Sequence, residues 1–392
     1  MNAGLPGRGA LTAILMGVIE AEVVRQRGLG GVPFRFPESD AAQQATLDEA
    51  GLSIDSLEQM GVKGAIEEMF GEIGMFGTDG DPVEMPPTIA LLADCIIRSW
   101  RDYAPSLTVQ SSDTTDAAKL HRHAIADLME EARDFASLVG HRYRVVAFLP
   151  PQHIYGLMWT ALVPEMLGAP VFRASLAKHI DLRAGDLIVA VPHQWRALSR
   201  RDRFPGDIIG ISAGAPMEDA DAEVLMAKGL IRLIDVYGAS ETGGIAFREA
   251  PSRDYMLLRR WRFDQDRAGT DRIIPADGAV VSLPDRITRF GDRFRLDGRH
   301  EQAVQVGGVN VSPDAVARLL CEHDSVAEAA VRLRSNGRLK AFLVPRNGVP
   351  AETIVATVSA YAVTRLPAPA RPVAYNVGVS LPRGPLGKAL DC

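Results

Sequence analysis

The spacing of apolar residues changes along the chain and predicts three kinds of structure. Near the N-terminus a single helical stripe carries Leu11, Ile14, Leu15, Val18 and Ile19. This repeat is typical of an α-helix that packs by one face. Short helices joined by Gly-rich, Pro-rich and acidic loops are expected over the rest of residues 1–100.

Between residues 107 and 284, short apolar runs alternate with segments long enough to form a helix. The strand-like runs are 145–149, 187–191, 207–211 and 230–236. Such alternation indicates an α/β fold with a largely parallel sheet. We therefore predict an α/β core over residues 101–298.

The last part of the chain, residues 299–392, has the pattern of a compact α+β domain. Strands are expected near 303–306, 327–333 and 340–344, and helices near 313–322 and 351–365. The predicted organisation is a helical region over 1–100, a core over 101–298 and a small α+β domain over 299–392.

Composition narrows the class of protein. With 392 residues, 47% of them hydrophobic and 23% charged, the chain has enough apolar residues for a sizeable core, which excludes disorder and small disulfide scaffolds. The 3 cysteines form no CxxC pair, so we expect no structural zinc, no disulfide framework and a reducing compartment. A net charge of -6 without a long basic stripe argues against nucleic acid as a partner.

The N-terminal apolar run is read as a cytoplasmic helix and not as a secretion signal. Glu20 and Glu22 follow it, and no small-residue cleavage site does. Apolar runs also stay shorter than the roughly 18 residues of a membrane span. We predict a cytoplasmic protein with a small-molecule substrate and no membrane partner.

Two small-residue turns follow strand-like runs and carry candidate chemistry. The turn within 235–244 presents Tyr237, Ser240 and Glu241 among glycines. Backbone amides in such a turn approach phosphates closely, and a carboxylate there suits Mg²⁺. The earlier turn within 211–216 is flat enough for a purine. It also matches the G-x-S-x-G pattern of hydrolases, an alternative with His300 and His323 as the only downstream histidines.

Further candidate residues follow in the order Asp292, Arg299 and, near the end of the chain, Lys388. With the two turns, this order and spacing resemble the adenylate-forming superfamily of acyl-CoA synthetases, aryl-acid ligases, nonribosomal adenylation domains and luciferases. The resemblance covers residues 107–392. It implies an α/β core with a mobile C-terminal lid, and Mg-ATP as the nucleotide.

The resemblance also implies roles for individual residues. Glu241 would bind magnesium, Lys388 would bridge the acid and the α-phosphate, His153 would gate the acyl pocket and Glu301 would be the hinge of the lid. Asp292 would bind the ribose and Arg299 the nucleotide. Tyr237 and the turn of Gly214, Ala215 and Pro216 would pack on the adenine, and Gly238 and Ser240 are further residues implied to bind the nucleotide. Beside the gate, Tyr155 and Trp159 are candidates either for the acyl pocket or for the core.

The phosphate loop departs from the family pattern. Its expected contacts are Ser111, Ser112, Thr114, Thr115 and Lys119. Asp113 and Asp116 stand where the family has glycines. Aspartate tolerates left-handed backbone angles, but two carboxylates beside a triphosphate repel it unless a cation offsets them.

A second resemblance lies in the N-terminal region. Asp55-Ser56-Leu57 and the helix after it resemble the site of an acyl carrier protein that takes phosphopantetheine, with Ser56 as the attachment residue. Residues 38–84 hold twelve Asp or Glu against Lys63 alone, a charge balance that suits a carrier. The alternative is an ordinary helix capped by Ser56, with Leu57, Met60 and Ile66 as its apolar contacts.

We therefore expect Mg-ATP-dependent adenylation of a carboxylic acid, by analogy an aromatic acid of secondary metabolism. The acyl group would pass to the thiol of CoA or of a pantetheinylated carrier protein. Two alternatives stay open: activation of another oxyanion such as nitrite, and a non-catalytic homologue that binds an acyl group or a carrier and whose phosphate loop has decayed.

Overall fold

The described part of the chain forms two compact units. The first comprises Met1–Arg262 and Pro275–Asp277, and the second comprises Phe263–Ile274 and Gly278–Cys392. The computed structural model describes residues 4–28, 34, 36, 44–71, 86–101, 104–110, 119–149, 151–264, 272–275, 278, 280–283, 285–299, 304–306, 309–334, 336–346 and 349–382.

The first unit is built on a large sheet, and the predicted α/β class is confirmed. Its strands run in the order β9-β8-β7-β6-β5-β3-β4. From β4 to β7 neighbouring strands are parallel, whereas β8 and β9 are antiparallel to their neighbours. The bounds are β3 Arg144–Ala147, β4 Val171–Arg173, β5 Asp186–Ala190, β6 Ile208–Ser212, β7 Leu230–Ala239, β8 Gly243–Ala250 and β9 Tyr255–Leu257.

Helices connect these strands and bury the largest side chains. Trp159, Trp195 and Phe135 are fully buried, and the rings of Phe135 and Trp159 lie 4.8 Å apart. Trp159 is therefore a core residue. The elements are α5 Ile125–Val139, α6 Ile154–Leu157, the π-helical η2 Met158–Leu162, α7 Val163–Leu167, α8 Pro192–Leu198 and α9 Asp219–Ala227.

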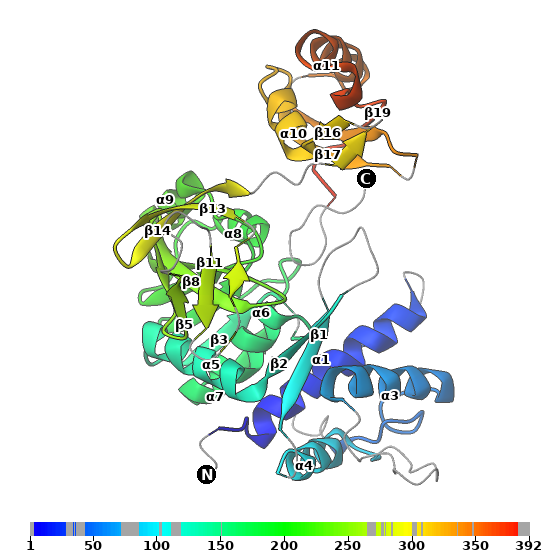
Figure 1. Cartoon of the computed structure of the whole chain (residues 1–392). Coiled ribbons are helices and arrows are strands. Elements are labelled where there is room, and N and C mark those ends of the chain that lie inside the picture. The colour runs from blue at the N-terminus through cyan, green and yellow to red at the C-terminus, as the bar shows by residue number, and fades with distance from the viewer. Residues whose placement is uncertain are drawn as a thin grey trace. The chain divides into compact units, whose positions relative to one another are not determined.

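The N-terminal helices pack onto the same unit (Figure 1). Helix α1 (Arg8–Arg27) contacts α3 (Ser56–Phe70), α4 (Ile89–Ser99) and η2. The predicted stripe is confirmed, since Leu11, Ile14 and Ile19 are fully buried. A separate hairpin, β1 (Ser106–Gln110) with β2 (Leu120–Ala124), packs against α3.

Two expectations about α3 are wrong. Asp55 is the N-cap in place of Ser56, because the Asp55 carboxylate accepts from Glu58 N and the Glu58 carboxylate accepts from Asp55 N in a capping box. Leu57 and Met60 are not apolar contacts, since they are 70% and 72% exposed. The expected burial of Ile66 is confirmed.

The second unit contains the predicted C-terminal α+β elements. Its buried core draws Leu320, Val331, Leu343 and Ile354 from two helices and two strands. Strands β17, β18 and β19 form one sheet, and β13 pairs with β14 as a hairpin. The elements are β13 Asp285–Phe290, β14 Arg293–Arg299, β15 Val304–Val306, β16 Val309–Val311, α10 Pro313–Cys321, β17 Val326–Leu333, β18 Leu339–Pro345, α11 Ala351–Arg365, the 3₁₀ turn η3 Ala368–Ala370 and β19 Ala374–Val377. Around the unit boundary lie β10 Trp261–Phe263, β11 Arg272–Pro275 and β12 Val281–Ser282.

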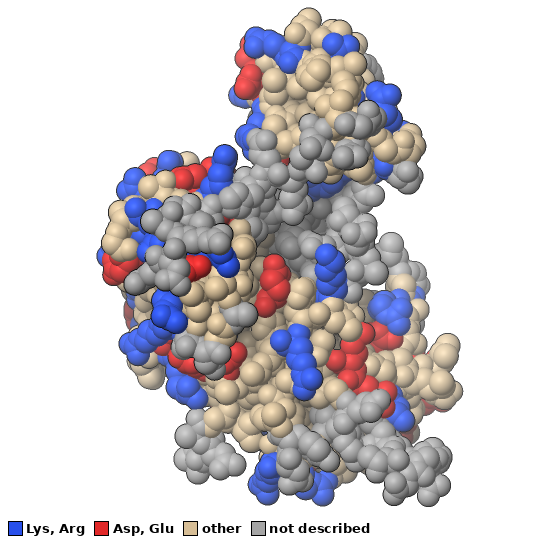
Figure 2. Space-filling model, viewed as in Figure 1, with Lys and Arg blue, Asp and Glu red and all other residues tan. Residues whose placement is uncertain are grey.

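On the face shown in Figure 2, Lys and Arg are interspersed with Asp and Glu over the described residues. Neither sign forms a continuous stripe on that face. Within the described ranges, no helix has the length and apolar character needed to cross a membrane. Cys95 and Cys321 are free thiols.

Candidate active site

Parallel pairing gathers three predicted site segments at one edge of the sheet. Ser212 at the end of β6 pairs with Asp235 in β7, and Ala190 at the end of β5 pairs with Ser212. The Gly214 turn therefore leaves the sheet next to the part of β7 that carries Tyr237. The segment that follows β3 and carries His153 emerges at the same edge, since β3 is parallel to β5. The carboxyl edge of a parallel sheet is the usual ligand site of α/β proteins.

The predicted adenine turn follows β6 directly. Gly214 has a φ of 86°, a left-handed conformation that a residue with a Cβ adopts only under strain. Gly214 and Pro216 are exposed and Ala215 is half-buried. The turn thus presents backbone and a proline ring, with no bulky side chain, as a flat surface for a purine.

Glu241 lies at the tip of the β7–β8 hairpin and is exposed. Thr242 shapes the hairpin from within, because its Oγ1 accepts from Ala239 N at 3.1 Å. Gly243 closes the turn with a φ of 69°. Among the described residues no group of three or more His, Cys, Asp or Glu is placed to hold a metal ion. A lone exposed carboxylate fits Mg²⁺, which is commonly held by one or two carboxylates together with substrate phosphates.

Tyr237 stands before the hairpin tip and is half-buried. Its ring meets the ring of Tyr255 edge to face, with centroids 5.9 Å apart. Gly238 is exposed and Ser240 is half-buried. Three of the residues predicted to bind the nucleotide, Tyr237, Gly238 and Ser240, thus share one hairpin with Glu241.

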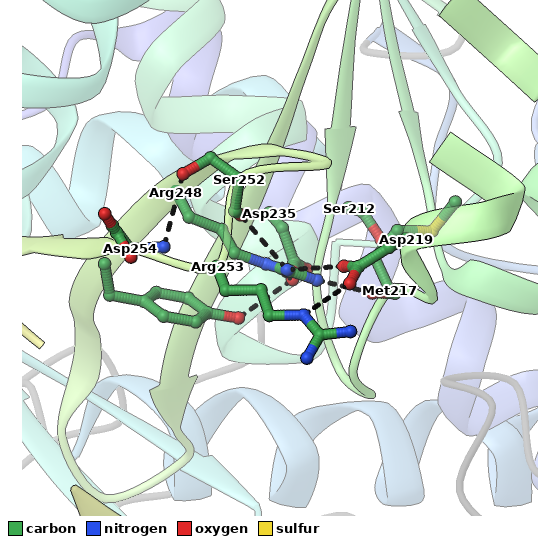
Figure 3. Close-up of polar contacts among 9 residues, drawn as sticks. Ser212, Met217, Asp219, Asp235, Arg248, Ser252, Arg253 and Asp254 are labelled. Atoms are coloured by element: carbon green, nitrogen blue, oxygen red, sulfur yellow. Dashed lines mark hydrogen bonds and ion pairs between the residues drawn. The ribbon is translucent and has the colours of Figure 1, made fainter. Parts of the chain in front are cut away.

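A buried ionic network lies beneath both turns (Figure 3). The Arg248 guanidinium, on β8, donates to Asp235 Oδ2 at 2.8 Å and to Asp219 Oδ1 at 3.1 Å. It also donates to the carbonyls of Met217 and Ser252. Arg248 and Asp235 are 6% and 2% exposed. One side chain thus joins β7, the end of the adenine turn and the start of α9.

Tyr255 completes this network by donating its hydroxyl to Asp235 Oδ2 at 2.9 Å. Burial raises the pKa of Asp235, and the charge of Arg248 opposes that shift. Sequence reasoning missed this network. The available signal was that each of two adjacent apolar runs, 230–236 and 243–250, holds one acidic and one basic residue, because charges that become buried require a partner.

His153 occupies the N-cap position of α6, where its side chain makes no capping hydrogen bond, and is half-buried. Two residues on, the Tyr155 hydroxyl donates to the carbonyl of Ala190 at 3.2 Å. Burial raises the pKa of Tyr155, and the nearby Asp235 adds to the shift. Residues 151–157, which carry the predicted gate His153, are called the gate segment. Tyr155 is therefore a neutral hydroxyl that links this segment to the end of β5.

Helix α1 forms a wall beside the same gate segment. A cavity of about 260 Å³ lies between α1, the end of β3 and β4, and it includes Gln152. A Cβ built on Gly17 would lie 2.1 Å from Pro151 Cγ. The close approach of α1 to this loop was not predicted from the sequence. The cavity is lined by Gly17, Glu20, Ala21, Val24, Ala147, Phe148, Leu149, Gln152, Arg173 and Ala174.

The other predicted residues are distributed as follows. Asp292 is exposed in the turn of the β13–β14 hairpin, and Arg299 is the last residue of β14. Lys119 is exposed just before β2. The residues that lie outside the described part of the chain are Ser111, Ser112, Asp113, Thr114, Thr115, Asp116, His300, Glu301 and Lys388.

The hydrolase alternative is wrong on the evidence of Ser212. A nucleophile elbow exposes its serine, but Ser212 is fully buried and its Oγ faces Met217 Sδ at 3.9 Å. Of the two downstream histidines, His323 bonds to the neighbouring Ser325.

A scan against models of protein families finds no match. Curated relatives extend over nearly the whole chain. A 4-coumarate–CoA ligase of Halorhodospira halophila is 36% identical over 387 residues, which are 96% of this chain and 97% of that protein. A 4-coumarate–CoA ligase of Rhodobacter capsulatus is 36% identical over 393 residues, with 96% and 98% covered.

Solved structures show the same fold at low identity. O-succinylbenzoate coenzyme A synthetase of Bacillus subtilis, in complex with AMP, has a TM-score of 0.52 at 20% identity, covering 72% of this chain and 67% of that one. The ATP-bound RpMatB-BxBclM chimera has a TM-score of 0.57 at 17% identity, covering 96% and 90%. On the evidence of the near full-length relatives and of this shared fold, the chain belongs to the adenylate-forming superfamily of acid–CoA ligases.

Proposed function

We propose that this protein activates a carboxylic acid with ATP and transfers the acyl group to coenzyme A. The observation that carries the proposal is the similarity, over 96% of the chain, to two proteins named 4-coumarate–CoA ligase. The gathering of the Gly214, Tyr237 and His153 segments at one sheet edge supports it, because that edge is where α/β proteins bind ligands.

The reaction has two halves. In the first, a carboxylate oxygen of the acid attacks the α-phosphorus of ATP, the bond to the β,γ-phosphates breaks, and pyrophosphate leaves. In the second, the thiol of coenzyme A attacks the acyl carbon, loses its proton and displaces AMP. Both halves develop negative charge, so placed cations and backbone N–H groups lower their barriers.

The described residues fit binding roles in the first half. The Gly214 turn and the Tyr237 ring offer apolar surface for the adenine, and Glu241 would hold Mg²⁺, which neutralises phosphate charge when bound. Asp292 is assigned to the ribose hydroxyls. Lys388 is assigned to the α-phosphate and the acid, a cation where charge develops.

For the acid we propose an aromatic substrate similar to 4-coumarate. This is the acid in the names of both near full-length relatives. A more distant relative, 24% identical, is named sulfoacetate–CoA ligase, so small sulfonated acids belong in any substrate panel. His153 and Tyr155, beside the sheet edge, are assigned to the acyl pocket.

The division into a helical region, a core and a lid that turns at Glu301 stays a prediction, as does the cytoplasmic location. The carrier hypothesis for residues 1–100 is a second proposal. The observation that favours it is that Ser56 is exposed and is followed by the exposed Leu57 and Met60. Intact-mass measurement after incubation with a phosphopantetheinyl transferase tests it: an unchanged mass, or addition that persists in Ser56→Ala, rejects attachment at Ser56.

The first test of the main proposal is acid-dependent exchange of pyrophosphate into ATP. The panel should hold hydroxycinnamates, benzoates, short aliphatic acids, sulfoacetate, amino acids, and nitrite with an arylamine. Exchange with hydroxycinnamates, followed by their coenzyme A thioesters, is the expected result. Exchange with nitrite alone would show that the substrate is another oxyanion and not a carboxylic acid. If the protein neither catalyses exchange nor binds ATP, the non-catalytic alternative is favoured.

Substituting Lys388 tests its assigned role. Lys388→Ala is expected to lower adenylate formation by at least about a hundredfold, the loss typical of removing a placed electrostatic group. Acid-dependent exchange measures it. Lys340→Ala, on β18 of the same unit, is the matched control. Unchanged exchange in Lys388→Ala would remove that residue from the mechanism.

The two aspartates of the phosphate loop have a separate test. Asp113→Gly with Asp116→Gly is expected to tighten ATP binding, because two negative charges beside the triphosphate are removed. Calorimetric titration at two salt concentrations measures this effect, which salt should reduce. An unchanged affinity would show that other cations already offset these charges.

A further inference from the structure

Two buried side chains outside the predicted motifs contact the backbone of the Glu241 hairpin. His123 is 7% exposed, and its Nε2 lies 2.7 Å from the carbonyl oxygen of Ser240. Glu131 is 2% exposed, and its Oε1 accepts from Gly244 N at 2.9 Å. The two contacts fall one residue before Glu241 and three residues after it.

The two side chains come from consecutive elements. His123 lies on β2, and Glu131 lies on α5, which begins at the residue after β2 ends. Strand β2 pairs with β1, with His123 opposite Leu107. The predicted phosphate loop, residues 111–119, joins these two strands. The segment that leaves the phosphate loop is therefore the one that contacts the hairpin of the predicted magnesium ligand.

The chemistry of the His123 contact requires a particular form of the ring. A carbonyl oxygen only accepts, so Nε2 must carry the proton. Burial lowers the pKa of His123 and so favours the neutral ring, while the carbonyl contact selects the tautomer with the proton on Nε2. The ring then has one defined donor, and it is directed at the hairpin.

The Glu131 contact depends on the two glycines at the end of the turn. A Cβ on Gly243 would lie 2.6 Å from Glu131 Oε2, and a Cβ on Gly244 would lie 2.7 Å from Oε1. Absent side chains at these positions let the carboxyl group reach the backbone. On the other side, Trp261 Nε1 donates to the Gly244 carbonyl at 2.8 Å, so both polar backbone atoms of Gly244 are bonded.

We propose that His123 and Glu131 are positioning residues that hold the hairpin of Glu241, and with it the Glu241 carboxylate, in the orientation that binds Mg-ATP. The proposal rests on the proposed function. A three-residue turn such as 240–242 directs its tip side chain through its backbone angles, and contacts at both ends limit those angles. Without them the carboxylate samples more orientations, and the metal is bound less tightly.

The experiment measures the dissociation constant of Mg-ATP by calorimetry and the Mg²⁺ concentration that gives half-maximal exchange. The variants are His123→Ala, His123→Gln, Glu131→Ala and Glu131→Gln in the full chain. His121→Ala, two residues away on the same strand, and Glu130→Ala, exposed on α5, are the matched controls. His123→Gln retains a hydrogen-bond donor and Glu131→Gln retains an acceptor. Recovery in these variants therefore distinguishes loss of the hydrogen bond from loss of folding.

We expect each Ala variant to weaken Mg-ATP binding and raise the half-maximal Mg²⁺ concentration about tenfold, the loss of one buried hydrogen bond. The Gln variants should recover most of this loss. The KM for the acid should stay unchanged. Folded Ala variants with wild-type magnesium dependence, or control variants with the same loss, would overturn the proposal. A wild-type protein that neither binds Mg-ATP nor exchanges pyrophosphate would instead reject the proposed function.

Discussion

Glu131 is buried among few opposing charges, and its ionisation is linked to folding. Burial raises the pKa of Glu131 from 4.5 to about 8, against smaller opposing effects of the Gly244 N–H and Arg260. Asp127 and Asp134 add slightly to the rise. The native state therefore binds this proton more tightly than the unfolded chain does.

The raised pKa of Glu131 makes the protein less stable as the pH rises. A carboxyl group with a raised native pKa stabilises the fold fully below its unfolded pKa near 4.5, and this contribution is lost as the pH rises through about 8. Glu131→Gln is neutral at every pH. Urea unfolding measures the free energy of unfolding between about pH 5 and about pH 9. We expect it to fall with pH in both proteins, and to fall less in Glu131→Gln than in the wild type, by on the order of a few kcal/mol. Glu130→Gln is the control, and equal pH profiles for wild type and Glu131→Gln would contradict the assignment.

At the scale of elements, helix α1 contacts the gate segment directly, because Gly17 has no side chain to separate the helix backbone from the ring of Pro151. Gly17 is buried in α1, and any Cβ there would overlap the rigid ring of Pro151. Gly17→Ala should therefore lower stability by about 1–3 kcal/mol, the usual cost of overpacking. The KM for the acid should rise as well, because Pro151 lies two residues from His153.

The control for this prediction is another helical glycine. Gly64 lies in α3, is exposed, and has no atom within 4 Å of an added Cβ. Gly64→Ala should raise stability by about 0.5–1 kcal/mol, because alanine has the higher helix propensity. Urea denaturation of both variants measures the difference. A stabilised Gly17→Ala with an unchanged KM would show that α1 and the gate segment adjust freely.

The elements that the sequence predicted well are those whose burial is continuous. The run 187–191 appears as β5 and the run 207–211 as β6, each shifted by one residue, because strands covered on both faces are apolar throughout. The β1–β2 hairpin was missed, since Leu120–Ala124 is mostly exposed and contains two histidines. The position of the α3 cap was off by one because Asp and Ser are equally good caps, and the contact with Glu58 decides between them.

The candidate site was predictable only where function constrains local sequence. The turns at Gly214 and Glu241 have glycines at left-handed positions, and short-range patterns reveal them. The contacts of Arg248, His123 and Glu131 join residues far apart in the chain, and a single sequence has no local signal for such pairs. Buried polar residues in apolar segments identify the candidates but not their partners.

At the scale of the whole molecule, the chain has two units, each with its own buried core. Asp292, which the proposed function assigns to the ribose, belongs to the second unit. Mg-ATP at about 100 times its dissociation constant should stabilise the native state by about 2.7 kcal/mol. Asp292→Ala should reduce this gain, whereas Asp324→Ala, exposed in the second unit, should not.

Differential scanning calorimetry with and without Mg-ATP measures this stabilisation in the wild type and in both variants. Chelating the magnesium should remove most of the gain, because ATP would then lack the ion that Glu241 is assigned to hold. A shift of equal size in the wild type and in Asp292→Ala would remove Asp292 from the nucleotide site.

The network around Arg248 also limits how the adenine turn can be moved between proteins. The turn at Gly214 is a short sequence, yet its last carbonyl, at Met217, accepts a hydrogen bond from the Arg248 guanidinium on another strand. Transplanting residues 211–217 alone would leave that carbonyl without its donor. Adding the arginine of position 248 as well would bury a charge without a partner in any host that lacks the aspartate of position 235. The practical unit for chimeric ligases is therefore the whole stretch from β6 through β9, which includes the Ser252 carbonyl and Tyr255, exchanged in one piece.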